Sequence, residues 1–362
     1  MPILVSVVVP TYKRPELLNR CLEALMAQDF DPSAYEVVVV DDALDEATRR
    51  IVEDWASRAE SFMIVPDPAL LFTEKTAEFP GDLSLFPRYS KSSFVRVPGI
   101  PLLRYISNTE THGPAAARNR GWRIASGEII AFTDDDCLPQ SGWLKHGVAA
   151  FKDGVVGVSG KVIVPLPDKP TDYELNMAEL AHSQFVTANC FYRRSALLEV
   201  DGFDERFTIA WREDSDLFFR LIERRFCLAE APDAVVVHPV RPARWGVSLA
   251  QQRRSQFNAL AFKKHPQLYR QNLQSSPPWE YYSVLATLLM AVFAGLTNQL
   301  LVMLAALTIW SALTLRFFVR RIRYTSHSLS HITEMFITSI LIPPLSVFWR
   351  LLGALKYRVV FL

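Results

Sequence analysis

The residues best suited to chemistry are acidic side chains that directly follow short apolar runs. Asp41 and Asp42 end one such run, and Asp134, Asp135 and Asp136 end another. Adjacent carboxylates repel one another unless a cation or hydrogen-bond donors compensate their charge. Hard divalent cations take oxygen ligands, and Mg²⁺ is often held by carboxylates together with substrate phosphates. The pattern predicts a cation and phosphate site; the alternative is a solvated acidic turn that caps the next helix.

A second acidic group lies further along the chain, where Glu213, Asp214 and Asp216 follow Trp211. A carboxylate within reach of an acceptor hydroxyl can act as a general base and remove the proton during attack. Acidic residues at a helix start are also favourable N-caps, which is the simpler interpretation. His238 follows another apolar run, where an imidazole is either structural or completes a carboxylate metal site.

The elements that position these residues alternate between strands and helices. Pro15 near the start of a helical pattern supports this interpretation, because proline is favoured in a first turn. The alternation predicts an α/β fold with a mostly parallel sheet, whose ligands bind at the carboxyl ends of the strands. Expected strands cover residues 3–9, 36–40, 128–132, 155–164 and 234–237, and expected helices 15–25, 47–59, 118–125, 195–200 and 214–224.

Residues 62–110 contain six prolines that interrupt any long element, so we expect a long irregular insertion there. The chain carries 39 basic and 38 acidic side chains, a balance that gives no support to a nucleic-acid binder. Its four cysteines lack metal-site spacing and are expected to be reduced and mostly buried in a cytoplasmic domain.

The last quarter of the chain is markedly apolar. Two nearly uncharged runs, 281–296 and 300–315, are joined by three polar residues and predict a membrane hairpin at about 280–316. Basic residues flank both ends, which places both ends in the cytoplasm. A buried soluble hairpin is the alternative. A third apolar segment at about 334–352, broken by two prolines, suits a kinked span, a re-entrant piece or an interfacial helix.

A series of short motifs runs through the first two thirds of the chain. The motifs are Val7–Arg14, Val39–Asp42, Gly113–Gly121, Phe132–Asp136, Thr187–Asn189, Gly202–Asp204 and Glu213–Leu217. Together they resemble the family 2 inverting glycosyltransferases of the GT-A fold. They occur in family order between about residues 3 and 240, and the ordered set is far more specific than any one motif. The resemblance implies a Rossmann-like GT-A domain at 1–245, and the composition of the rest predicts an amphipathic juxtamembrane region at 246–278 and a membrane region at 279–362.

The resemblance also implies a role for individual residues. Asp136 and His238 would bind the metal, and Asp214 would be the catalytic base, with Glu213 and Asp216 as supporting residues. Asp42 would bind the uracil or other base, Asp134 would contact the ribose or sugar, and Asp135 would also lie on the donor side. The remaining donor-side residues are Pro10, Thr11, Arg14, Arg118 and Asn119, and the acceptor-side residues are Thr187, Ala188, Asn189 and Trp211.

The implied reaction is inverting transfer from a nucleotide-diphosphate sugar, with uridine favoured, to a hydroxyl of a lipid-linked or envelope glycan acceptor. It would need Mg²⁺ or Mn²⁺ and take place at the cytoplasmic face of a multi-pass membrane protein. A polyprenyl-phosphate glycosyltransferase and a non-catalytic nucleotide-sugar-binding scaffold are the alternatives. Gln251 and Arg254 keep the spacing of a motif of processive members, but Ser255 replaces its tryptophan, which argues against a polymer-extruding synthase. This segment is otherwise a membrane-surface helix or an acceptor-side lid.

Overall fold

The chain folds into two compact units, and the computed structural model describes residues 3–59, 62–64, 100–109 and 111–361. The domain boundaries predicted from the sequence stay a prediction, but two internal segments group with the C-terminal part of the chain. The first unit comprises Met1–Ile163, Gln184–Ile209 and Arg220–His238, and the second Val164–Ser183, Ala210–Phe219 and Pro239–Leu362.

One mixed sheet forms the core of the first unit, with the strand order β3-β4-β2-β1-β5-β8-β7-β9-β6. The strands from β3 to β5 in this order run parallel, β8 is antiparallel to both neighbours, and β6 is antiparallel to β9. The predicted α/β fold with a mostly parallel arrangement is therefore confirmed. The strands are β1 (Val5–Thr11), β2 (Tyr35–Asp41), β3 (Phe62–Ile64), β4 (Leu102–Ser107), β5 (Ile129–Phe132), β6 (Leu138–Pro139), β7 (Val155–Ile163), β8 (Cys190–Arg193) and β9 (Cys227–Val237).

The central strands are rich in valine because both of their faces are covered. Every residue of β2 is buried, and β1 is buried except at Pro10. β-Branched side chains fit such pleated, doubly covered strands well. This burial explains why short runs without alternation could be predicted as strands.

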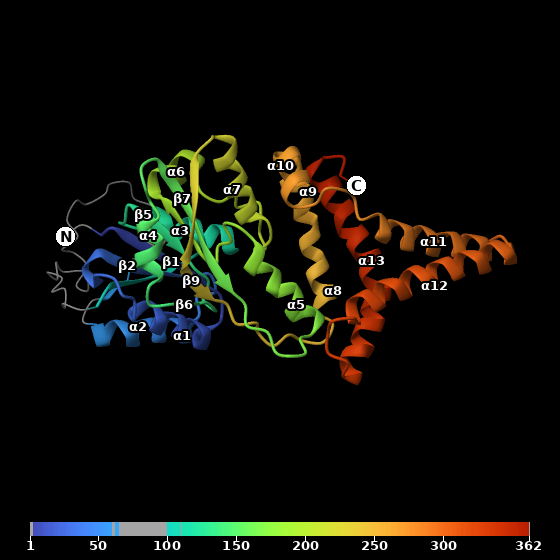
Figure 1. Cartoon of the computed structure of the whole chain (residues 1–362), viewed down its shortest axis with the longest axis horizontal. Coiled ribbons are helices and arrows are strands. Elements are labelled where there is room, and N and C mark those ends of the chain that lie inside the picture. Colours follow the sequence, from blue (N-terminus) through green and yellow to red (C-terminus); the bar gives the residue numbers. More distant parts are fainter. Residues whose placement is uncertain (1–2, 60–61, 65–99, 110, 362) are drawn as a thin grey trace, which may run out of the picture. The chain divides into compact units, whose positions relative to one another are not determined.

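Helices flank the sheet, and Figure 1 shows α1 and α2 next to each other at one side of it. α3 packs on β1 and β2 at Gly121, where an added Cβ would lie 2.4 Å from a methyl group of Val8. That close approach accounts for the glycine in this motif. The helices of the first unit are α1 (Pro15–Met26), the 3₁₀ turn Pro32–Ala34, α2 (Glu46–Ala59), α3 (Pro114–Ile124), α4 (Trp143–Ala149) and α6 (Arg194–Val200).

The expectation of an irregular insertion at 62–110 is wrong at its two ends. β3 follows α2, and β4 adds to the sheet beside β2. Prolines lie close to β4, so the sequence gives no clear sign of a strand there. In the structure β4 pairs with β2, and the hydroxyl of Tyr105 in β4 donates to Asp41 at 2.8 Å. Residues 65–99, which made up most of the predicted insertion, lie outside the described residues.

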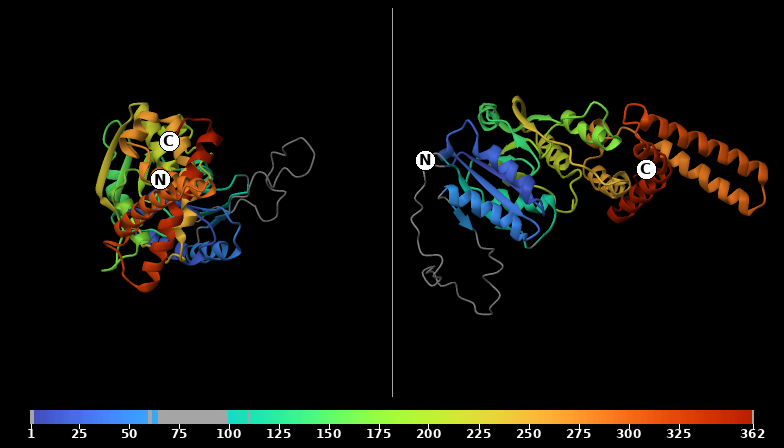
Figure 2. Two further views of the ribbon diagram at one scale, coloured as in Figure 1. Left: turned by 90° about the vertical axis from the view of Figure 1, so that its right-hand side faces the viewer. Right: turned by 90° about the horizontal axis from the view of Figure 1, so that it is seen from below.

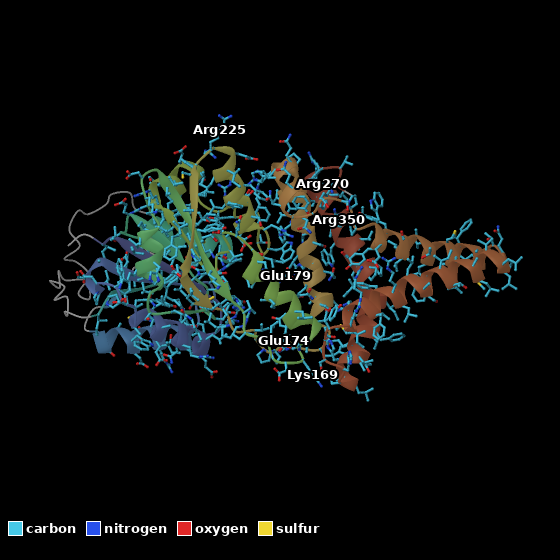
Figure 3. All side chains as sticks on the ribbon, in the orientation of Figure 1. Lys169, Glu174, Glu179, Arg225, Arg270 and Arg350 are labelled. Atoms are coloured by element: carbon cyan, nitrogen blue, oxygen red, sulfur yellow. The ribbon has the colours of Figure 1, made fainter. Side chains whose placement is uncertain are left out.

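The second unit is helical. Its helices are α5 (Asp172–Ala178), the 3₁₀ turn Glu179–His182, the first turns of α7 (Glu213–Glu223), α8 (Val247–Gln251), the 3₁₀ turn Gln252–Ser255, α9 (Gln256–Lys264), α10 (Pro266–Asn272), α11 (Trp279–Leu296), α12 (Leu300–Ile322) and α13 (Leu329–Tyr357). Figure 2 shows α11 and α12 as a long antiparallel hairpin, as predicted. Figure 3 labels Arg350 on α13 near Arg270 of α10.

Three helices of this unit, α11, α12 and α13, are long and apolar enough to cross a membrane. The third apolar segment is longer than predicted, and the expected break at Pro343 and Pro344 is wrong, because α13 continues through both prolines. An interior proline removes one helical hydrogen bond, and helices in apolar surroundings tolerate it where neighbouring groups satisfy the freed backbone.

Candidate active site

The acidic residues singled out in the first unit gather at one edge of the sheet. Thr11 pairs in register with Asp41, and Val8 pairs with Phe132, so β1, β2 and β5 end side by side. The loops that follow these strands carry Asp42 and the three aspartates. Carboxyl ends of parallel strands are where open α/β sheets bind their ligands.

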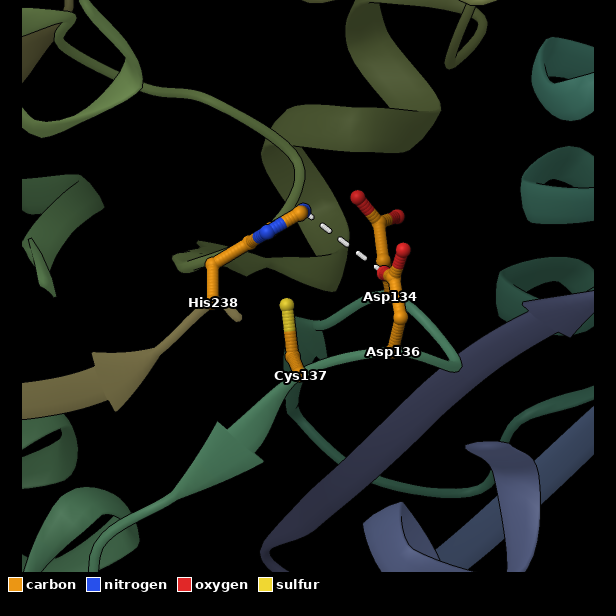
Figure 4. Close-up of side chains that lie close together, drawn as sticks. All are labelled: Asp134, Asp136, Cys137 and His238. Atoms are coloured by element: carbon orange, nitrogen blue, oxygen red, sulfur yellow. Dashed lines mark ion pairs between the residues drawn. The ribbon is translucent and has the colours of Figure 1, made fainter. Parts of the chain in front are cut away.

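A group that could hold a metal ion lies at this edge. Asp134, Asp136, Cys137 and His238 each offer a ligand atom, and these atoms all lie within 4.8 Å of one another (Figure 4). His238 Nε2 lies 3.6 Å from Asp136 Oδ1, and both side chains are nearly inaccessible to solvent. The backbone of His238 is fixed just beyond β9, where its N–H donates to the carbonyl of Ile163 at 2.8 Å.

The chemistry of these donors suits a hard or borderline divalent cation. Burial, with the charges of Asp134 and Asp136, raises the pKa of Cys137, which disfavours the thiolate. The oxygen and imidazole atoms of the group suit Mg²⁺ and Mn²⁺, which prefer such ligands to sulfur. His238 Nδ1 is buried and has no hydrogen-bond partner among the described residues. The ring nitrogen that faces Asp136 is Nε2, so imidazole ligation would use Nε2.

The middle aspartate belongs to a different part of the site. Asp135 accepts hydrogen bonds from Thr11 Oγ1 at 2.8 Å and from Arg14 at 3.1 Å. Burial raises the pKa of Asp135 to about 6, despite the opposing charge of Arg14. Asp135 therefore connects the loop after β5 to the loop after β1, whereas its neighbours on either side approach His238. Pro10, which precedes Thr11 in β1, pairs in register with Val40.

Arg118 and Asn119 occupy different surroundings on α3. Arg118 is buried and donates to Asp134 at 2.7 Å. Burial would raise the pKa of Asp134, but the charge and hydrogen bond of Arg118 outweigh it and lower the pKa. Asn119 hydrogen-bonds the backbone of Phe203 through both its amide nitrogen and its oxygen, each at 2.8 Å. Its predicted donor-side role stays a prediction, and in the structure its two hydrogen bonds hold the loop that carries Phe203.

Asp42 is the centre of a hydrogen-bond cluster that the sequence did not reveal. Asn108 Nδ2 donates to it at 2.7 Å, the N–H of Gly113 donates at 2.8 Å, and His112 Nδ1 lies at 3.1 Å. Gly113 has a φ of 115°, and a Cβ there would lie 3.0 Å from the carbonyl of Thr208. Only the proximity of His112 to the glycine-rich motif could have indicated this cluster.

The predicted acceptor-side segment 187–189 directly precedes β8 in the chain and is buried. The hydroxyl of Thr133 donates to the carbonyl of Ala188 at 3.1 Å. Asn189 donates to the carbonyls of Lys161 and Ala234 and accepts from Trp143, all at 2.8 Å. Thr187 is also buried. Asn189, just before β8, thus links β7 and β9. The acceptor role of the segment stays a prediction.

The second unit holds the other acidic group. Asp214 is partly exposed at the start of α7, where its carboxylate accepts from the N–H of Ser215 at 2.6 Å. Asp216 is fully buried and lies 2.5 Å from Lys264 and 3.1 Å from His265. Glu213 is buried. Of the three acidic side chains, Asp214 is therefore the most accessible.

Residues of the juxtamembrane helices surround this acidic group. Asn258 accepts hydrogen bonds from Trp211 Nε1 and Arg212 Nε, both at 3.0 Å. Burial lowers the pKa of Arg212 and of Arg254, although the nearby charge of Glu213 opposes the shift. Arg254 lies in the 3₁₀ turn directly before α9, the helix that carries Asn258. Sequence reasoning named Trp211 and Arg254 but missed Asn258, Lys264 and His265.

Comparisons with known proteins agree with this arrangement. A family model described as Glycosyl transferase family 2 matches residues 6–67 and 92–207, and one described as Glycosyl transferase family group 2 matches 171–352. Glycosyltransferase AglE of Haloferax volcanii is 26% identical over 252 residues, which cover 66% of this chain and 67% of that protein. The pre-mycofactocin glycosyltransferase of Mycobacterium tuberculosis is 34% identical over 155 residues, but the match covers only 38% of this chain and 33% of that protein.

A solved structure shares the fold. The mannosyltransferase from Pyrobaculum calidifontis, in complex with GDP-Man and Mn²⁺, superposes with a TM-score of 0.53 at 19% sequence identity. The superposition covers 99% of this chain and 89% of that structure.

Proposed function

Because the chain belongs to the family 2 glycosyltransferases, we propose that it transfers a sugar, with inversion, from a nucleotide-diphosphate sugar to an acceptor hydroxyl. The proposed acceptor is a lipid-linked or envelope glycan at the cytoplasmic face of the membrane. The observation that carries this proposal is the group of Asp134, Asp136 and His238 at the carboxyl edge of the sheet.

The cation is proposed to be held by Asp136 and His238, with Asp134 beside them. When bound, it supplies Lewis-acid stabilisation of the negative charge on the leaving diphosphate. The position of His238 Nε2 beside Asp136 and the preference of hard cations for oxygen ligands support oxygen and imidazole ligation. The Mn²⁺ bound together with GDP-Man in the related mannosyltransferase structure supports the same class of cation.

The donor is proposed to lie along the ends of β1, β2 and β5. A carboxylate such as Asp42 can accept hydrogen bonds from the ring N–H of uracil, and equally from guanine, so its chemistry suits both bases. Asn108, His112 and Gly113 hold this carboxylate in one orientation. Because the carboxylate is already oriented before the nucleotide binds, less side-chain conformational entropy is lost on binding. We favour uridine, the nucleotide expected from the sequence.

Asp214 is proposed as the general base. It is the accessible carboxylate of its group, whereas Asp216 is buried and forms ion pairs with Lys264 and His265. A base takes the proton as the acceptor oxygen attacks the anomeric carbon, so no covalent intermediate on the protein is required. One displacement at that carbon inverts its configuration.

The membrane acceptor is proposed because the chain ends in three helices long and apolar enough to span a bilayer. Basic residues flank the α11–α12 hairpin on both sides, which favours a cytoplasmic location for its two ends. A catalytic domain tethered in this way would find lipid-linked acceptors by diffusion within the membrane.

Membranes that contain the chain, incubated with a panel of radiolabelled UDP- and GDP-sugars, test the proposal. We expect one donor to label a lipid or glycan fraction, with the labelling lost after chelation and restored by Mn²⁺. Labelling by none of the donors, together with the absence of thermal stabilisation by UDP and Mn²⁺, would favour a non-catalytic protein. Full turnover after exhaustive chelation would contradict the cation site.

A further inference from the structure

The first half of α13 is fixed to residues at the open end of the α11–α12 hairpin. Arg321, in the last turn of α12, donates to the hydroxyl of Thr338 at 2.7 Å. His331 Nε2 lies 3.1 Å from the hydroxyl of Thr325, which follows α12. Residues before α8 also reach this half of α13, since the N–H of Gly246 donates to Glu334 at 2.7 Å.

The second half of α13 is fixed to the same side. Arg350 donates to Gln274, just before α11, at 3.0 Å. The carbonyl of Tyr357 accepts from Lys263 at 2.8 Å. At Gly353 the backbones of α13 and α9 approach so closely that an added Cβ would lie 2.4 Å from the carbonyl oxygen of Gln256.

These contacts define the direction of the helix. They extend over about 39 Å of α13, at 1.5 Å per residue, yet all their partners belong to the open end of the hairpin or to the helices before it. If α13 ran parallel to α11 and α12 across a bilayer, only its first turns could contact residues at the open end of the hairpin. Figures 1 and 2 show α13 running across the base of the hairpin.

The side chains of α13 are arranged with apolar groups outward and polar groups inward. The buried face includes His331, Ser339 and Arg350. In the second half of the helix, the exposed Leu341, Phe348 and Leu355 recur at intervals of seven, which is about two helical turns and therefore one side of the helix. Ile337 lies four residues before Leu341 and extends this exposed apolar face into the first half. Leu329 and Phe336 are also exposed, on a neighbouring side of the helix.

We propose that α13 lies in the plane of the membrane interface and does not span the bilayer, with its exposed apolar face in the boundary between headgroups and acyl chains. The inference rests on the membrane association in the proposed function. It commits to lipid as the occupant of that face because exposed Phe336 of α13 packs against Phe318 of α12, which belongs to the candidate membrane hairpin. Interfacial helices lie in this way, with their apolar side about 5–10 Å deep.

The consequence concerns the height of the candidate base above the bilayer. α9 is held against α13 at Gly353 and also contacts the segment around Asp214, through Asn258 and through the pair of Lys264 with Asp216. The depth of α13 therefore fixes the height of that segment. α13 would act as a positioning element for an acceptor whose reactive hydroxyl lies close to the membrane surface.

Spin labels on single cysteines test this geometry in reconstituted vesicles of full-length protein. The exposed Cys227 is first replaced by serine, since the other three cysteines are buried. Labels at Ile337→Cys, Phe348→Cys and Leu355→Cys report the depth of α13, and a label at Leu289→Cys, exposed in the middle of α11, is the internal reference. Relaxation by oxygen and by a water-soluble nickel chelate gives each depth.

The expected result is one shallow depth for the three α13 labels, with Leu289→Cys much deeper, at about 15 Å or half of the hydrocarbon core. Labels on α13 whose depths differ progressively along the helix would overturn the inference and indicate a spanning helix. α13 labels in water with a deep Leu289→Cys label would also overturn it. A Leu289→Cys label in water would instead reject the membrane hairpin, and the inference with it, while sugar transfer by the same samples tests the enzymatic proposal separately.

Discussion

At the scale of single residues, neighbours of identical type differ in function because their partners differ. Asp135 is held by Thr11 and Arg14, while Asp134 and Asp136 approach His238. Around α7, Asp216 is buried against two basic side chains and Asp214 is accessible. In both groups the carboxylate that we propose to act on a ligand is either the accessible one or one that lies beside the other proposed metal ligands.

The first prediction separates the ligands from their neighbour. Asp136→Asn should weaken Mn²⁺-dependent nucleotide binding by at least tenfold, since even the loss of an outer-shell partner costs about 10–100-fold in metal affinity. Cys137→Ala should leave the affinity nearly unchanged, because Mn²⁺ prefers oxygen and imidazole ligands to sulfur. Calorimetric titration of UDP with and without Mn²⁺ measures both variants. Equal effects of the two substitutions would make Cys137 a ligand.

The second prediction assigns the base. Asp214→Asn keeps the shape and the helix-capping ability of the side chain but cannot take a proton. It should lower kcat by about 10²–10⁴-fold and leave the affinity for the nucleotide-sugar nearly unaltered, because a base acts in the transition state. Steady-state kinetics and donor titration measure the two effects.

Near-normal kcat in this variant would remove the assignment and direct attention to Glu213, since Asp216 is committed to Lys264 and His265. It would also favour a phosphate acceptor, which needs no base. Loss of donor affinity together with kcat would indicate a binding role for Asp214.

At the scale of secondary structure, local patterns and tertiary contacts compete. β4 forms despite nearby prolines because it completes the sheet beside β2, and α13 continues through Pro343 and Pro344. Glycines lie where two elements approach each other closely. Gly121 of α3 packs against β1, and Gly353 of α13 packs against α9. Alanine at such a position gains helix propensity but loses packing.

The third prediction uses this competition. Gly353→Ala should lower the free energy of unfolding by about 1–3 kcal/mol, the usual cost of overpacking, because its Cβ would meet backbone atoms of Gln256. Gly295→Ala is the matched control in α11, where the added Cβ would meet only the flexible Met303 side chain at 3.3 Å. The control should be neutral or stabilising by up to about 1 kcal/mol, since alanine is the better helix former. Thermal unfolding in detergent compares the two variants. Equal stability of Gly353→Ala and Gly295→Ala would contradict the close packing of α9 and α13.

At the scale of the whole molecule, the chain combines a sheet-based unit with a helical unit that ends in apolar helices. The hairpin exposes large apolar side chains along both of its helices, among them Phe293 and Leu301. A hydrocarbon environment would cover such a surface, whereas water would not.

The fourth prediction concerns topology. A cysteine introduced by Asn298→Cys, in the turn between α11 and α12, should react with a membrane-impermeant maleimide added to intact cells. Ser276→Cys, exposed just before α11, is the control and should react only after permeabilisation. Reaction of both only after permeabilisation would mean that the hairpin lies on the cytoplasmic surface or is covered by protein.

The sequence by itself determined the features that depend on local pattern. Buried valine-rich strands, the acidic residues that follow them, the family motifs and the apolar hairpin all follow from residue types at short spacing. The tertiary structure alone decided which carboxylate has which partner, how Asp42 is oriented and where α13 runs. His238 reaches Asp136, and Lys264 reaches Asp216, only because elements distant in sequence pack together. A local pattern states what a segment can become, but the partners that fix its function are brought to it by the fold.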